Sequence, residues 1–171
     1  PDEARRIINI YRQSNFKISK LWRDAQYMVS QLTNRRAVAF GRRNVIGIDA
    51  SNKALLLPSG LPLFYEDLSY DGDEYTYKVR RGRNKIYGGK VIENVCQAIA
   101  RCIIGEQMLK IAKNYKVVLT VHDSIVCCVE DNKVAEAQAF VETCMRWTPD
   151  WAAELPVDCE SGTAKSYGDC E

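Results

Sequence analysis

The pattern of apolar and polar positions changes along the chain from helical to strand-like and back again. Residues 2–32 carry apolar side chains at the three- and four-residue spacing that is typical of amphipathic helices. The polar pair Ser14-Asn15 interrupts this spacing and offers a new N-cap. We therefore expect two helices that meet at an angle near residue 15.

Short apolar runs separated by turn residues follow between residues 33 and 89, which predicts a set of strands. The predicted strands are residues 37–40, 44–48, 54–57, 61–65 and 75–79.

The same region contains an acidic segment, residues 66–74, followed by a basic one, residues 78–90. Two adjacent segments of opposite charge fit the two sides of a solvated hairpin. The alternative is a loop that follows nucleic-acid phosphates, with Arg80, Arg81 and Arg83 as its contacts, because clustered arginine and lysine supply most non-specific nucleic-acid affinity.

The longest predicted helix covers residues 90–113, and its polar side chains do not stay on one side. In the first half one polar stripe lies opposite an apolar one, whereas the polar residues of the second half lie about half a turn away. The first stripe consists of Lys90, Glu93, Asn94, Gln97 and Arg101, opposite Val91, Val95, Ile99 and Cys102; the later polar residues are Glu106, Lys110 and Lys113. The first stripe therefore predicts either contacts with base edges and sugars or a buried polar network between helices.

Residues 116–130 predict a β-hairpin with a polar tip. Two apolar runs, 117–121 and 125–129, flank His122, Asp123 and Ser124. Both runs are apolar on both faces, so we expect buried strands. The tip then holds a carboxylate beside the chain's only histidine, which suits a hard cation such as Mg²⁺; the alternative is an ordinary polar turn.

The remaining chain predicts a helix over residues 134–147, which Pro149 ends, and a last strand over residues 155–159. Helix and strand signals occur in clusters rather than in strict alternation, which favours an α+β fold.

Length and composition narrow the class further. A chain of 171 residues with a net charge of +2 is neither disordered nor strongly basic, and it is long enough for one domain with a real core. It has no apolar run of membrane-spanning length and no signal peptide at its first residues, so we expect no membrane partner. Its seven cysteines lack a CxxC pattern and lie mostly in apolar runs, which predicts reduced, buried thiols in a cytoplasmic protein. A structural zinc site is not expected, since there is one histidine and no paired cysteine spacing.

The order of motifs resembles the C-terminal part of a family A DNA polymerase of the type that bacteriophages encode. The carriers are YGGK at 87–90, ENVCQAIAR at 93–101, VLTVHDSIV at 118–126 and the Trp-rich turn at 146–151. By this resemblance residues 1–33 correspond to helices at the end of the fingers, 34–88 to a β-hairpin and loop insertion that includes LLLPSGLPLFY, and 89–171 to the second half of the palm. The implied fold is a partial polymerase palm, with an antiparallel sheet and its hairpin backed by long helices.

The resemblance also implies roles for individual residues. Asp123 corresponds to a palm aspartate that binds the two catalytic Mg²⁺ ions, and His122 to a histidine near the primer terminus. Gln97 corresponds to a glutamine that reads the minor groove, with Asn94 and Arg101 as neighbours. Further DNA contacts are expected from Lys90, Arg80, Arg81 and Arg83. The implied substrates are primer-template DNA and deoxynucleoside triphosphates.

The chain departs from the family pattern at two positions and lacks two motifs. Ser124 stands where the family usually has glutamate, and Cys102 where relatives often have aspartate. The other metal-binding aspartate and the nucleotide-binding fingers helix are absent. We therefore expect one piece of a split, cleaved or truncated polymerase. It would be inactive alone and would share its Mg²⁺ ions with a carboxylate from an N-terminal part on another chain.

Two alternatives remain open at this stage. NVIGIDAS at residues 44–51 resembles the first strand of ribonuclease H-like nucleases, and Asp49 would then pair with Asp123 on a two-metal nuclease site. As a simple turn residue, which we prefer, Asp49 has no such role. The second alternative is a non-catalytic nucleic-acid-binding accessory domain in which Asp123 belongs only to a turn.

Overall fold

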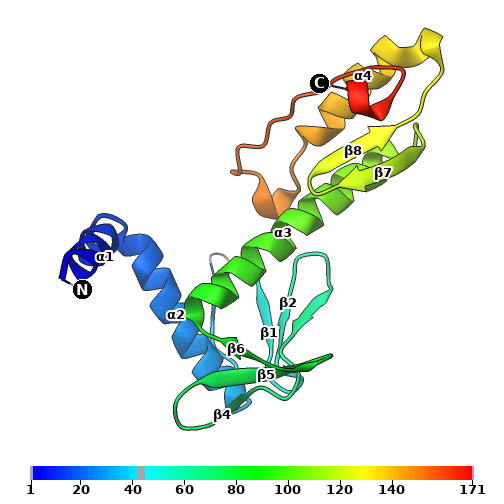
Figure 1. The fold of residues 1–171 in the computed structure, drawn as a ribbon. Helices are drawn as coiled ribbons and strands as arrows, with labels where there is room; N and C mark the ends of the chain where they lie inside the picture. The colour runs from blue at the N-terminus through cyan, green and yellow to red at the C-terminus, as the bar shows by residue number, and fades with distance from the viewer. Residues whose placement is uncertain (1, 42–44, 171) are drawn as a thin grey trace. The chain divides into compact units, whose positions relative to one another are not determined.

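The computed structural model describes residues 2–41 and 45–170, and the chain forms two compact units, residues 1–99 and 100–171 (Figure 1). Both units combine helices with small antiparallel sheets. The division of the sequence into segments 1–33, 34–88 and 89–171 stays a prediction.

The first unit begins with the two expected helices, α1 (Asp2–Ser14) and α2 (Phe16–Thr33), so this prediction is confirmed. Asn15 occupies the N-cap position of α2, but its side-chain amide donates to the Tyr11 carbonyl (3.1 Å) and does not cap the new helix. Helix α1 buries none of its side chains, whereas α2 supplies the core with Ala25, Met28, Val29 and Leu32.

Two three-stranded antiparallel sheets follow α2 in the chain. The first joins β1 (Gly47–Asp49), β2 (Ala54–Leu56) and β3 (Pro62–Phe64) in that order. The second joins β4 (Ser69–Tyr70), β5 (Tyr75–Val79) and β6 (Gly82–Ile86). Buried side chains of α2, the strands and the helix α3 (Gly88–Ile111) form one core, which includes Phe40, Ile46, Leu55, Tyr65, Leu68, Ile86, Val91 and Val95.

The strands near residues 54–57, 61–65 and 75–79 are confirmed, and the described part of the 44–48 prediction overlaps β1; residue 44 lies outside the described residues. The strand over 37–40 is wrong. This segment has no β-ladder, and its apolar pattern reflects the packing of Val38 and Phe40 on the core. Strand β6 was not predicted because its sequence, GRNKI, is mainly polar.

Helix α3 (Gly88–Ile111) begins in close contact with α2. The Gly88 amide donates to the side-chain oxygen of Gln26 (2.8 Å), which satisfies one of the free N–H groups at the helix start. A Cβ atom at Gly88 would lie 2.0 Å from the Trp22 carbonyl oxygen, so only glycine fits here. The YGGK motif therefore has a packing reason at its first glycine.

The second unit contains the end of α3, the hairpin β7 (Val117–Val121) and β8 (Ser124–Cys127), and α4 (Val134–Met145), followed by short 3₁₀ turns. Gln107 of α3 is fully buried, and its amide donates to the carbonyls of Met145 (2.6 Å) and Trp147 (2.9 Å). It thereby satisfies carbonyl groups at the end of α4, which would otherwise lack partners.

The predicted helix over 134–147 is confirmed, but the last strand over 155–159 is wrong. Arg146, the C-cap residue of α4, holds this segment through hydrogen bonds to the Asp158 carboxylate (2.7 Å) and the Cys159 carbonyl (3.1 Å). Side-chain contacts thus replace the backbone ladder that a strand requires.

The prediction of buried thiols is only partly right. All seven cysteines are free, but Cys96, Cys128 and Cys170 are exposed. Cys102 and Cys144 are buried, and burial raises the pKa of the Cys144 thiol. Within residues 2–41 and 45–170, no helix combines the length and apolar character that a bilayer span needs.

The close approach at Gly88 gives a direct test of the fold. Gly88→Ala is expected to lower the free energy of unfolding by about 3 kcal/mol, since the new methyl group meets backbone atoms that have no room to move. The matched control is Gly89→Ala, whose Cβ would contact only the exposed ring of Tyr87 (3.1 Å) and should stay within about 1 kcal/mol of the original chain. Urea unfolding followed by circular dichroism measures both, and equal effects would contradict the packing described.

Candidate functional site

The tip of the β7–β8 hairpin carries the two predicted catalytic residues. Val121 pairs with Ser124, which leaves His122 and Asp123 as a two-residue loop. Of these two, only His122 has a positive φ (53°). A positive φ at the first loop position alone is the pattern of a type II′ turn, where glycine is usual. The histidine therefore sits on strained backbone at an exposed tip, and strained non-glycine residues often mark functional sites.

The expectation that both strands are buried is wrong. Val118, Leu119 and Val121 are 50%, 44% and 37% exposed. The sheet has only two strands among the described residues, and its register shifts between Val117 and Leu119, so no neighbouring strand covers β7. Apolar residues on both faces predicted that these strands are buried, but the described part of this chain leaves them partly exposed.

Asp123 offers one exposed carboxylate, which is a suitable oxygen ligand for Mg²⁺. Across residues 2–41 and 45–170, no three histidine, cysteine, aspartate or glutamate side chains lie together in a way that would hold a metal ion. The described residues therefore hold no complete metal site of this kind, and the assignment of Asp123 as a metal ligand stays a prediction.

The polar stripe of α3 is open to solvent at three of its positions, Glu93, Gln97 and Arg101. The other two have partners: Lys90 pairs with Glu93 (2.7 Å), and the Asn94 amide donates to the Tyr65 hydroxyl (3.4 Å). Tyr65 is buried, and this burial raises the pKa of its hydroxyl. Gln97 and Arg101, one helical turn apart, are thus the accessible members of the stripe.

The polar side chains of the second half of α3 contact the Trp-rich turn. The Lys110 ammonium lies 3.8 Å from the centre of the Trp147 ring, and Glu106 accepts a hydrogen bond from the Trp151 indole (3.4 Å). The change of polar side along the helix therefore has a structural cause within this half.

The basic segment pairs with the acidic one across the second sheet. Lys78 pairs with Glu66 (2.8 Å) and Lys85 with Glu74 (2.5 Å). Arg83 binds the Asp67 carboxylate (2.6 Å). Its guanidinium also donates to the Ser69 and Thr76 hydroxyls, so it is committed to the fold.

Arg80 and Arg81 form the turn between β5 and β6. Val79 pairs with Gly82, whose φ of 98° suits only glycine. Both arginines are exposed, and no hydrogen bond or ion pair connects either one to another described residue. Of the three arginines predicted to bind nucleic acid, these two are available for an external partner.

Asp49 ends β1, and its carboxylate accepts hydrogen bonds from the Asn52 amide side chain (2.7 Å) and backbone (3.1 Å). These bonds, the side-chain one first, lower the pKa of Asp49. This arrangement matches the simple turn residue that we preferred.

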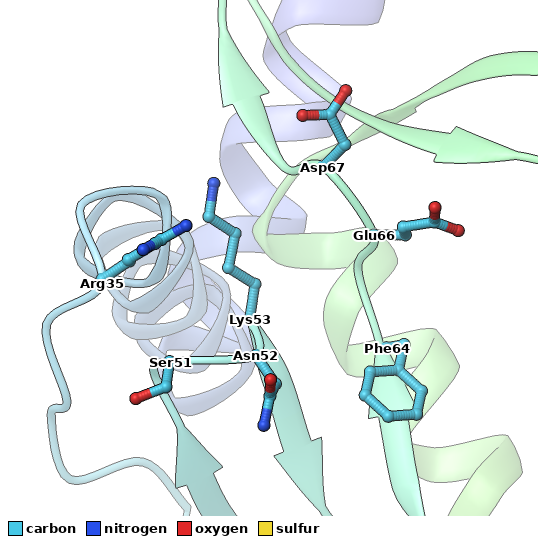
Figure 2. Close-up of a pocket in the computed structure, with 7 residues that line it drawn as sticks. All are labelled: Arg35, Ser51, Asn52, Lys53, Phe64, Glu66 and Asp67. Atoms are coloured by element: carbon cyan, nitrogen blue, oxygen red, sulfur yellow. The ribbon is translucent and has the colours of Figure 1, made fainter.

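A surface pocket in the first unit was not predicted. It has a volume of about 470 Å³ and is lined by Arg35, Ser51, Asn52, Lys53, Phe64, Glu66 and Asp67 (Figure 2). These residues come from four separate stretches of sequence, and no motif marks them; the only sequence signal is the Ser51-Asn52 turn.

The comparison with known proteins links the chain to a polymerase. It is 28% identical over 180 residues to a DNA polymerase of Bacillus phage SP02. This match covers 96% of the chain but only 27% of the phage protein, so the chain spans about a quarter of that relative's length. No family model and no solved structure matches the chain. The similarity supports a relationship to phage DNA polymerases at low identity, whereas the assignment to family A and to the palm stays a prediction.

The strained turn at His122 can be tested by comparing two substitutions. His122→Gly removes the left-handed strain, whereas His122→Ala keeps it while removing the imidazole. The glycine variant should therefore be more stable than the alanine variant by about 1 kcal/mol. Thermal unfolding of both variants measures this difference. Equal stability, or a more stable alanine variant, would contradict the turn geometry.

Proposed function

We propose that this chain contributes the metal-binding hairpin and the minor-groove helix to the palm of a family A DNA polymerase. The observation that carries the proposal is the similarity to a phage DNA polymerase along 96% of the chain. The exposed Asp123 at a strained hairpin tip and the accessible side chains of Gln97 and Arg101 support it.

The chemistry assigned to the hairpin is nucleotidyl transfer. Mg²⁺ ions, when bound, activate the primer hydroxyl and stabilise the charge that develops on the pyrophosphate. Asp123 is the one ligand that this hairpin offers, because Ser124 carries no carboxylate. In this proposal the second carboxylate comes from a part of the polymerase outside the described residues, among which no group of three metal-binding side chains lies together. In this proposal the two-residue turn places Asp123 at the hairpin tip before a metal ion binds, as preorganised electrostatic catalysis needs.

The helix assigned to duplex DNA is α3. Gln97 has an amide that both donates and accepts, and Arg101 adds a cation one turn further along the same helix. Minor-groove acceptors are nearly the same for all base pairs, so such contacts hold a duplex without selecting its sequence.

The alternatives have less support. A nuclease that uses Asp49 has to free this carboxylate from the Asn52 bonds that now hold it in a turn. A non-catalytic DNA-binding domain remains as an outcome of the experiments below.

The catalytic proposal is tested in a chimera. The chain replaces the matching 27% of the Bacillus phage SP02 polymerase, and primer extension is measured with Mg²⁺. We expect extension by the chimera, and a loss on the order of 10²–10³-fold on Asp123→Asn, because the substitution removes a preorganised charge. The isolated chain should be inactive.

Asp169→Asn, at another exposed aspartate of the second unit, is the control and should leave extension unchanged. Full extension with Asp123→Asn would refute the metal-binding role. A chimera that binds primer-template normally but never extends it would favour the non-catalytic alternative.

The exposed turn at Arg80 and Arg81 leads to a separate prediction about DNA affinity. If Arg80 and Arg81 each contact one phosphate of duplex DNA, the double substitution Arg80→Gln/Arg81→Gln should reduce the slope of log affinity against log salt by about 1.8. Fluorescence anisotropy of the full chain with a labelled duplex at several salt concentrations measures the slope.

The matched control is Lys78→Gln/Lys85→Gln, which removes two cations of the same hairpin that are already paired with Glu66 and Glu74. A smaller change in slope is expected there. If both pairs of substitutions change the slope equally, the turn has no special part in binding DNA.

A further inference from the structure

Three residues that line the pocket around Phe64 and Arg35 have unusual backbone conformations. Among the described residues, four that are not glycine have a positive φ: Arg35 (56°), Lys53 (51°), Asp67 (51°) and His122. The first three all line this pocket. Each left-handed residue costs roughly 1–2 kcal/mol, and such residues persist where the surrounding structure or a function demands them.

Arg35 shows this most clearly. Its backbone amide donates to the Leu32 carbonyl (3.0 Å), and the Arg36 amide donates to the Gln31 carbonyl (2.9 Å). This pair of bonds is the Schellman motif that ends α2, and Arg35 occupies its left-handed position, which is usually glycine. An arginine therefore stands where glycine would be more stable, and its side chain borders the pocket (Figure 2).

The charges around the pocket leave a net positive surface. Glu66 and Asp67 are matched by Lys78 and Arg83, and the bond from Arg83 is the main reason that the pKa of Asp67 is lowered. The charges of these two carboxylates are therefore offset by the Lys78 ammonium and the Arg83 guanidinium.

Neither of the two cations that line the pocket forms an ion pair with a described carboxylate, although Asp67 is close enough to attract the charge of Lys53. The Lys53 ammonium donates to the neutral carbonyl of Leu68 (2.5 Å) rather than to a carboxylate. No bond to another described residue occupies the Arg35 guanidinium. The pocket thus favours an anionic ligand.

An aromatic ring completes the lining. Phe64 is 57% exposed at the end of β3, although a large apolar side chain gains by burial. A ring with an open face stacks a nucleobase, and a nearby arginine binds phosphate through its planar fork. The volume falls within the range of about 300–1,000 Å³ that is usual for small-ligand sites.

From this combination we infer that the pocket binds one nucleotide unit, with its base stacked on Phe64 and its phosphate held by Arg35. Ser51 and Asn52, in the turn between β1 and β2, offer polar atoms beside it. An inorganic anion would not use the ring, and an apolar ligand would not use the arginine. The site needs neither a metal ion nor Asp123, so it extends the proposed function without resting on it.

The test measures binding of two probes to the full chain in the presence of EDTA, which keeps metal chemistry out. The probes are a short fluorescent oligodeoxythymidine, followed by anisotropy, and unlabelled deoxyadenosine monophosphate as a competitor. Arg35→Gly should weaken oligonucleotide binding by about tenfold or more, as expected when a charged hydrogen-bond donor is lost. The same substitution should also raise thermal stability, because glycine suits the left-handed position.

Phe64→Leu should weaken binding by about fivefold or more while it keeps an apolar side chain at the end of β3. The matched control is Arg36→Gln, which removes the same charge one residue away, outside the pocket, and should change affinity by less than about twofold.

A stabilised Arg35→Gly variant with weakened binding supports the site, because unfolding then fails to explain the loss. Competition by the monophosphate identifies a free nucleotide as sufficient, whereas oligonucleotide binding without competition assigns the site to a nucleic-acid strand. Unchanged binding in both pocket variants, or an equal loss with Arg36→Gln, overturns the inference. The chimera's activity does not enter either result, so the two proposals fail independently.

Discussion

The placement of the α3 side chains depends on one backbone contact, the approach of Gly88 to the Trp22 carbonyl in α2. Since a helix turns by a fixed angle per residue, fixing its first turn decides which later side chains face the core. Val91 and Val95 then fall on the buried side, and Gln97 on the exposed side. The polar face that we assign to DNA is therefore set by a steric constraint some three turns before it.

A second feature of the first unit is that the paired and the unpaired cations of the β5–β6 hairpin lie at different places. Three of the five cations of the β5–β6 hairpin, Lys78, Arg83 and Lys85, are matched to acids of the preceding segment, and Arg83 makes several bonds at once. These pairs are exposed, so they contribute little to stability, but they cancel the hairpin's own field. Within this hairpin the unmatched charge lies at the Arg80-Arg81 turn, where an anionic partner has access.

Much of the fold follows from local patterns in the sequence. Helical spacing located α1, α2, α3 and α4, and the polar triplet at His122 located the hairpin tip. The strands predicted at 37–40 and 155–159 failed because an apolar run does not reveal whether another strand is available to pair with it. For the same reason the exposure of Val118 and Leu119 was not foreseen.

The same distinction applies to the candidate sites: residues in local motifs were predicted, whereas contacts between residues distant in sequence were not. Asp123 and Gln97 were found through motifs that each lie in one short stretch. The bond from Arg83 to Asp67 joins residues 16 positions apart, and the opposite charges of segments 66–74 and 78–90 indicated only that the segments pair, not which residues do. The pocket was not predicted because its distinguishing property is the positive φ of Arg35, Lys53 and Asp67. These residue types do not indicate a left-handed conformation in the sequence.

The left-handed arginine at the end of α2 also has an evolutionary consequence. Selection for stability alone would replace Arg35 by glycine, since a single codon change relieves the strain and most proteins tolerate stabilising changes well. A lineage that no longer needed the guanidinium would therefore drift toward glycine at this position. The persistence of arginine at position 35 in related sequences would therefore indicate that its guanidinium is needed.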